Sequence, residues 1–163
     1  MCIRDRIYRD FASKEDIVAA LVEADLNAFL DESSLRRAIA EGDSMAIRGW
    51  ITDLVLRKAD PQHAPLLPEI MAESARNERI AAIVCCTDTR VRSSLLSALA
   101  AFSSSPCCPE RLATAADLIM TVMMGLCSRQ LARLQGDSAP LVSRVQQIID
   151  REIEAIVADT SRP

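Results

Sequence analysis

Apolar side chains recur every three or four residues along most of the chain, which is the period of an amphipathic helix. The first such stretch follows Ser13, a good N-cap residue, and we expect its helix to start at Lys14 and to end near residues 31–34. Its apolar face consists of Ile17, Leu21, Ala24 and Ala28. A second helix is expected over residues 43–58, where Asp60-Pro61 stops it and where the stripe is Ile47, Ile51, Leu54 and Val55.

Four more helices are expected, over residues 65–76, 77–102, 109–134 and 139–158. The third of these begins at Pro109 and is apolar nearly all round between Leu118 and Leu126, so it needs cover on more than one side. The last one carries a broad stripe formed by Leu141, Val145, Ile148, Ile149, Ile153, Ile156 and Val157. The pattern therefore predicts an all-α fold, a bundle of helices.

Composition agrees with this fold class. Half of the 163 residues are hydrophobic but only 3% are aromatic, so aliphatic side chains must fill the interior, as in helical bundles. The net charge of −4 excludes a protein that grips nucleic acid with its whole surface. Six cysteines without a signal-like start indicate a reducing, cytoplasmic location. The most apolar run, within residues 117–129, is shorter than the ~20 residues of a bilayer span, and we expect no membrane association.

Residues 7–17 carry a short motif, Ile-Tyr-Arg-Asp-Phe-Ala-Ser-Lys-Glu-Asp-Ile. It resembles the end of the DNA-binding domain of TetR-family transcriptional regulators, in which the Tyr closes the recognition helix and the Lys opens a connecting helix. A weaker resemblance covers Glu69–Leu99, and the order of the expected helices also suits that family. The resemblance implies a helix-turn-helix remnant over residues 1–13 and a TetR-like ligand-binding and dimerisation domain over residues 14–163.

The same resemblance implies a bacterial, ligand-responsive regulator, more often a repressor than an activator, whose intact form binds operator DNA. Tyr8 and Lys14 would contact DNA phosphates, since a hydroxyl and an ammonium both donate hydrogen bonds without reading bases. The alternative is that Tyr8 only covers a helix end and Lys14 only lies in solvent. Arg9 and Asp10 stand where relatives often carry an aromatic residue and His, and few residues precede Ile7. We therefore expect most of the DNA-reading head to be missing from this chain.

Ligand pockets in helical domains lie between helices, with apolar walls and a few polar groups. Methionine makes an adaptable wall, which suits a small apolar or cationic ligand. Methionines at helical spacing are nevertheless more often core residues than ligand contacts. The candidates for the pocket are Trp50, His63, Met71, Cys85, Met120, Met123 and Met124.

The two terminal helices are the candidates for a homodimer interface, because in the family they form a four-helix contact between two copies. A terminal helix as apolar as residues 139–158 needs a partner, either in its own chain or in a second copy. The interface candidates are Val122, Leu126, Val145, Ile149, Ile153 and Ile156.

Neither a metal site, a cofactor nor enzymatic activity is expected. The cysteine pairs Cys85-Cys86 and Cys107-Cys108 lack the two-residue gap of zinc sites, and His63 is the only histidine. The sequence has no nucleophile elbow, HExxH, GxGxxG or phosphate loop. Three alternatives stay open: a thiol-reactive sensor at Cys107-Cys108, a helical interaction module without a small-molecule pocket, and a helical enzyme.

Overall fold

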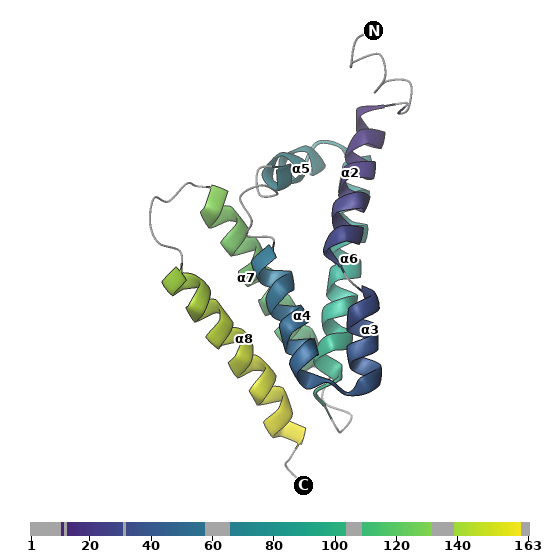
Figure 1. Cartoon of the computed structure of the whole chain (residues 1–163). Helices are drawn as coiled ribbons and strands as arrows, with labels where there is room; N and C mark the ends of the chain where they lie inside the picture. Colours follow the sequence, from purple (N-terminus) through teal and green to yellow (C-terminus); the bar gives the residue numbers. More distant parts are fainter. Residues whose placement is uncertain are drawn as a thin grey trace.

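The computed structural model describes Phe11 and residues 13–30, 32–57, 66–103, 109–131 and 139–160, and within these ranges it contains seven helices and no strand (Figure 1). The prediction of an all-α helical bundle is confirmed. The helices are α2 (Lys14–Phe29), α3 (Glu32–Glu41), α4 (Ser44–Arg57), α5 (Leu66–Ser74), α6 (Glu78–Ala100), α7 (Pro109–Leu131) and α8 (Ala139–Thr160).

Three helices begin where a polar side chain satisfies the first free amides. The Oγ of Ser13 accepts a hydrogen bond of 3.1 Å from the Asp16 amide at the start of α2. At α4, Asp43 accepts from the amides of residues 45 and 46, at 3.1 and 2.9 Å. At α6, the Oδ1 of Asn77 accepts from the amides of residues 79 and 80, at 3.1 and 3.3 Å. Because such caps are local, the sequence predicted these starts to within one residue.

Helix α3 was not predicted. The first helix was expected to reach residues 31–34, but α2 ends at Phe29 and α3 follows over Glu32–Glu41. Gly42 ends α3 with a φ of 66°. Its amide donates to the Ile39 carbonyl, and the Asp43 amide donates to the Ala38 carbonyl, which is the pattern of a glycine-terminated helix. Leu35, Ala38 and Ile39 follow the helical spacing of three and four, but six of the ten residues of α3 are polar, so its short apolar stripe was overlooked.

Helix α6 contacts five of the other described helices: α2, α3, α4, α5 and α7. Figure 1 shows α2 running alongside α6 on one flank of the molecule and α8 on the other flank. The four predicted stripe positions of α4 are all buried, and they join buried residues of α3, α6, α7 and α8 in one core. The stripe of α2 is covered less completely, because Leu21 keeps half of its surface exposed.

Helix α7 extends on both sides of the apolar run within residues 117–129. Residues 109–129 contain an 18-residue stretch with a mean hydropathy of 1.3 and are long and apolar enough to cross a bilayer. A core helix of a soluble protein passes the same test of length and composition. In this chain six α7 side chains are buried against other helices: Ala115, Ala116, Ile119, Met123, Leu126 and Cys127.

Candidate ligand-binding site

A cavity of about 400 Å³ lies among α5, α6 and α7. Met71 comes from α5, one face of α6 supplies residues at positions 84, 87, 88 and 91, and one face of α7 supplies residues at positions 120, 121, 123, 124 and 127. Both sets follow the helical spacing of three and four, which places each set on one side of its helix. The full lining is Met71, Val84, Thr87, Asp88, Val91, Met120, Thr121, Met123, Met124 and Cys127.

Most of the cavity wall is apolar and rich in sulfur. Met123 and Cys127 are buried, Met120 and Met124 are half-buried, and Met71 is 41% exposed. These methionines therefore differ from ordinary core residues, because three of them retain accessible surface next to an open volume. Unbranched thioether side chains adjust to different shapes, so this wall can pack against ligands of different outline.

The polar groups of the cavity wall act as hydrogen-bond acceptors. The Thr87 hydroxyl donates to the Ile83 carbonyl at 2.9 Å, and the Thr121 hydroxyl donates to the Asp117 carbonyl at 2.7 Å. Each hydroxyl has thereby used its single donor and keeps only lone pairs. Asp88 is exposed and forms no hydrogen bond or ion pair with another residue of the described ranges. A ligand in this cavity therefore meets acceptors that lack donors.

The charged groups next to the cavity carry more negative than positive charge. Arg92, one turn after Asp88, binds Asp117 through two hydrogen bonds of 2.7 and 3.2 Å. These hydrogen bonds and the Asp117 charge raise the pKa of Arg92, and Asp88 contributes to the same shift. The Arg92 hydrogen bonds lower the pKa of Asp117. Arg92 and Asp117 balance each other, so Asp88, which lines the cavity, leaves these three groups with a net charge of −1.

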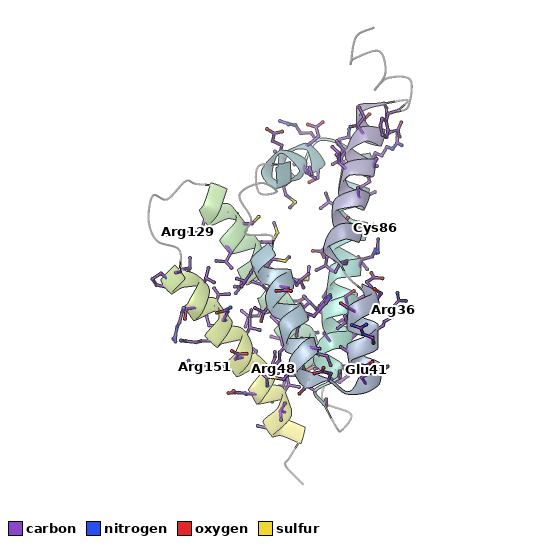
Figure 2. The ribbon with its side chains drawn as sticks, viewed as in Figure 1. Arg36, Glu41, Arg48, Cys86, Arg129 and Arg151 are labelled. Atoms are coloured by element: carbon purple, nitrogen blue, oxygen red, sulfur yellow. The ribbon has the colours of Figure 1, made fainter. Side chains whose placement is uncertain are left out.

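The structure brings four of the seven predicted pocket residues to this cavity: Met71, Met120, Met123 and Met124. Trp50 packs against the hydrophobic core on α4 instead. Cys85 is exposed on α6 without lining the cavity, as is its neighbour Cys86 (Figure 2). His63 lies outside the described residues. That these residues bind a ligand stays a prediction.

Sequence reasoning missed the α6 side of the cavity. Val84, Thr87, Asp88 and Val91 share one face of that helix, so the spacing was visible in the sequence. An aspartate within an otherwise apolar and threonine-containing face was the available signal. The sequence did not indicate which face of α6 meets α7, because that depends on the pairing of helices distant along the chain.

A polar cluster joins the beginning of α6 to the beginning of α2. The amide nitrogen of Asn77 donates a hydrogen bond of 3.0 Å to the Glu15 carboxylate. Arg79 forms an ion pair with Asp16. The pKa of Glu15 is lowered, first by its own backbone amide and next by Asn77. The pKa of Asp16 is lowered, first by the Ser13 hydroxyl and then by the Arg79 charge. Helix α6 thus lines the cavity and also holds the first turn of α2.

Of the predicted DNA contacts, Tyr8 lies outside the described residues, and Lys14 is the first residue of α2, as predicted, with its side chain undescribed.

The predicted interface residues face the core of their own chain. Leu126, Val145, Ile149, Ile153 and Ile156 are buried in the core of their own chain, and Val122 packs against that core. The physical reason is that α8 packs against α4 and α7, which covers the four buried positions of its stripe without a second copy. Among the described side chains of α7 and α8, the large apolar ones left exposed are Leu118, Leu141 and Val157.

Comparisons with models of protein families, with characterised proteins and with solved structures find no match to this chain. The geometry of the cavity and of the α2–α6 cluster is therefore the basis for any function. Within the described ranges, no group of three or more His, Cys, Asp or Glu side chains is placed to hold a metal ion.

Proposed function

We propose that this chain is the ligand-binding and dimerisation part of a ligand-responsive, TetR-like transcriptional regulator of bacterial origin. The observation that carries the proposal is that α6 both lines the apolar cavity and holds the start of α2. In the family that residues 7–17 resemble, the helix that opens at this Lys leads to the DNA-reading head. A ligand that changes the position of α6 would therefore change the position of α2.

The mechanism is a shift between two arrangements of α2. A ligand moves such an equilibrium only if it binds one arrangement more tightly than the other. The α6 wall supplies a route for this preference, because Asn77 and Arg79 lie at the end of the same helix that carries Val84, Asp88 and Val91. In a homodimer, this shift would change the spacing of two DNA-reading heads and release or engage the operator, with repression as the expected mode.

The chemistry of the cavity favours an apolar ligand that carries a cationic donor group. Its methionines and valines suit an apolar body, and its polar wall supplies acceptors beside a net negative charge. An ammonium group would donate to Asp88 and to the threonine oxygens, and a charge-assisted hydrogen bond is stronger than a neutral one. A carboxylate in the same position would be repelled.

The first experiment compares three probes with the same body and different charge: 4-phenylbutylammonium, 4-phenylbutanol and 4-phenylbutanoate. We expect the ammonium compound to raise the melting temperature most and the carboxylate least. A tenfold excess over Kd stabilises a protein by about 1.4 kcal/mol, which is about 3–6 °C for a chain of this size. Asp88→Asn should remove the preference for the cation, whereas Asp53→Asn, an exposed change on α4 away from the cavity, should keep it.

If none of the three probes stabilises the chain, the result favours the alternative function, a helical assembly module without small-molecule sensing. The DNA-binding part of the proposal has its own test. The source DNA upstream of Met1 is read for an in-frame helix-turn-helix continuous with Ile7. The whole protein it encodes should then retard the DNA in front of its gene in a mobility-shift assay, and the bound probe should change that retardation.

A further inference from the structure

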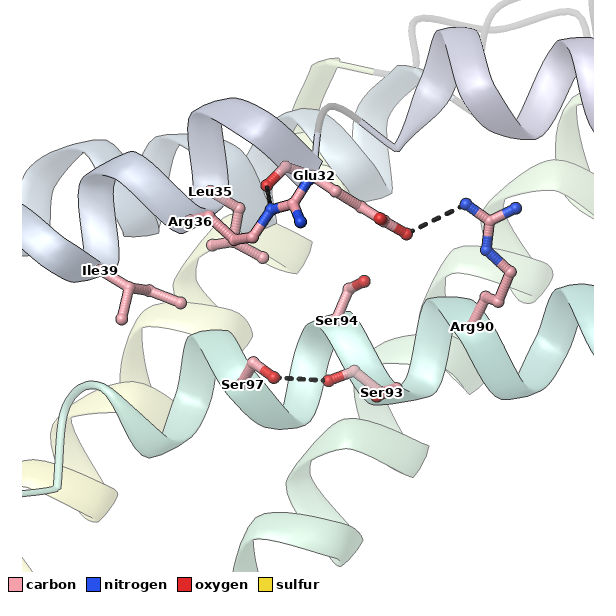
Figure 3. A pocket seen from close by; sticks show the side chains of 8 residues that line it. All are labelled: Glu32, Leu35, Arg36, Ile39, Arg90, Ser93, Ser94 and Ser97. Carbon is pink, nitrogen blue, oxygen red and sulfur yellow. Dashed lines mark hydrogen bonds and ion pairs between the residues drawn. The ribbon is translucent and has the colours of Figure 1, made fainter.

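A second, smaller cleft lies between α3 and α6, on a different face of α6 from the apolar cavity (Figure 3). Its volume is about 230 Å³. Helix α6 contributes three serines and an arginine, and α3 contributes a glutamate, an arginine and two aliphatic side chains. The lining is Glu32, Leu35, Arg36, Ile39, Arg90, Ser93, Ser94 and Ser97.

One residue of α3 holds both guanidinium groups. The Nε of Arg36 donates to the Glu32 carbonyl at 3.1 Å, and Arg90 binds the Glu32 carboxylate at 3.1 Å. Figure 3 shows the two guanidinium groups on opposite sides of the Glu32 side chain. A guanidinium has five N–H donors, so each arginine keeps donors beyond the one that Glu32 occupies. Two positive charges against one carboxylate leave this triad with a net charge of +1.

The serines add hydroxyl groups on the facing helix. The Ser97 hydroxyl donates to the Ser93 carbonyl at 3.0 Å. Ser94 is half-buried and its hydroxyl has no hydrogen-bond partner among the described residues, although it faces the Glu32–Arg90 pair (Figure 3). In contrast to the apolar cavity, this cleft therefore has donors that lack acceptors. Leu35 and Ile39 form an apolar side next to them.

We propose that this cleft binds a small organic carboxylate, whose oxygens accept hydrogen bonds from the free donors of Arg90 and from Ser94, while Arg36 adds positive charge on the other side of Glu32 and Ile39 packs against the apolar part. Guanidinium groups recognise carboxylates through paired, charge-assisted hydrogen bonds, and a hydroxyl supplies a further donor. The site is independent of the proposed regulator function, because it shares no lining residue with the cavity among α5, α6 and α7. Either site can exist without the other.

The test uses the full chain and two probes of nearly the same shape, benzoate and neutral benzamide, in calorimetric titrations. We expect saturable binding of benzoate with a Kd in the range of about 0.1 to 10 mM, and at least tenfold weaker binding of benzamide. Arg36→Gln should raise the Kd for benzoate severalfold, since it removes one positive charge and leaves the Glu32–Arg90 pair without a net charge. Arg37→Gln is the matched control, because Arg37 is exposed on the same helix but does not line the cleft.

A second variant tests binding without breaking a contact that holds α3 against α6. Replacing Arg90 would break its ion pair with Glu32, whereas Ser94→Ala removes a hydroxyl that holds no other described residue, and we expect it to raise the benzoate Kd severalfold. The proposal is overturned if benzoate shows no saturable binding, if benzamide binds as well as benzoate, or if Arg36→Gln and Arg37→Gln behave alike. Binding of inorganic phosphate but not of benzoate would also overturn it, because the cleft would then act only as a site for simple anions.

Discussion

The side-chain amide of Asn77 connects two helices, because its nitrogen donates to the Glu15 carboxylate of α2 while its oxygen accepts from the first amides of α6. The residue that fixes where α6 begins therefore also fixes the first turn of α2 against it. These two functions use different atoms of one side chain, so they can be separated by substitution.

Asn77→Asp should keep the N-cap of α6 and lose the hydrogen bond to Glu15 of α2. Aspartate caps helices as well as asparagine does and suits the positive end of α6, but it has no N–H for Glu15 and places a second negative charge beside it. We expect nearly unchanged stability of α6 and faster hydrogen exchange in the first turn of α2. Asn77→Ala should remove both functions and cost about 1 kcal/mol or more in denaturant unfolding. Unchanged exchange in α2 of the Asp variant would show that the Asn77–Glu15 hydrogen bond does not stabilise the first turn of α2.

Stability should depend on acid pH through three carboxylates. The pKa values of Glu15, Asp16 and Asp117 are lower in the folded chain than their ordinary values. A lowered pKa means that the folded state binds protons less readily than the unfolded state, so the contribution is complete above about pH 4–5 and is lost as pH falls through the folded pKa. We expect a flat stability contribution from these groups between about pH 5 and 8 and a decline below about pH 4.

Asp16→Asn isolates one of these groups. The difference in unfolding free energy between Asp16→Asn and the native chain should be present at neutral pH and should shrink below about pH 4, where the native carboxyl becomes protonated. Asp53→Asn is the control, since Asp53 is exposed on α4. A difference for Asp16→Asn that is the same at pH 7 and at pH 3 would contradict the assigned hydrogen bonds with Ser13 and Arg79.

Two positions of α8 should respond very differently to shortening. Ile153 is fully buried within the chain, whereas Val157, one turn later, is 41% exposed. Ile153→Ala should destabilise the fold by about 2–5 kcal/mol through lost burial and a residual cavity. Val157→Ala should change stability by about 0.5 kcal/mol or less. Equal effects of the two variants in urea unfolding would mean that α8 packs against α4 and α7 through another face.

Self-association should depend on the exposed apolar side chains of α7 and α8 rather than on their buried stripes. Leu118→Asp should turn the expected homodimer into a monomer in analytical ultracentrifugation, with little change in melting at a fixed low concentration. Met45→Asp on α4 is the control, because Met45 is even more exposed and lies on neither of the two terminal helices. A native chain that sediments as a monomer, or a Leu118→Asp variant that remains a dimer, would refute this assignment.

The helices that the sequence predicted well are those with strong local signals. Asp43, Asn77 and Pro109 mark helix starts by their own chemistry, and the predicted stripe of α4 is buried as expected. Helix α3 was missed although Leu35, Ala38 and Ile39 have helical spacing, because the stretch is only ten residues long and mostly polar. Local signals act within one turn, so they define a helix without indicating which helix it meets.

The candidate site, too, depends on helix pairing that local sequence signals do not reveal. The methionines of α7 could be identified by type and spacing, but Asp88 and Thr87 enter the site only because α6 and α7 pair in one register. The sequence predicts that the stripe of α8 needs cover, and its central positions are covered, whereas Leu141 and Val157 stay exposed. Periodicity alone does not distinguish cover by a second copy from cover by α4 and α7, and Ile149 and Ile153 lie against their own chain.

The coupling of the cavity to α2 is tested most directly by hydrogen exchange in the first turn of α2, measured by mass spectrometry with and without saturating 4-phenylbutylammonium. We expect changed exchange at residues 13–18 as well as around the cavity in α6 and α7. We also expect that both changes weaken in Asp88→Asn and persist in Asp53→Asn. Probe binding that protects only the cavity and leaves α2 unchanged would contradict the claim that α6 couples the cavity to the connecting helix.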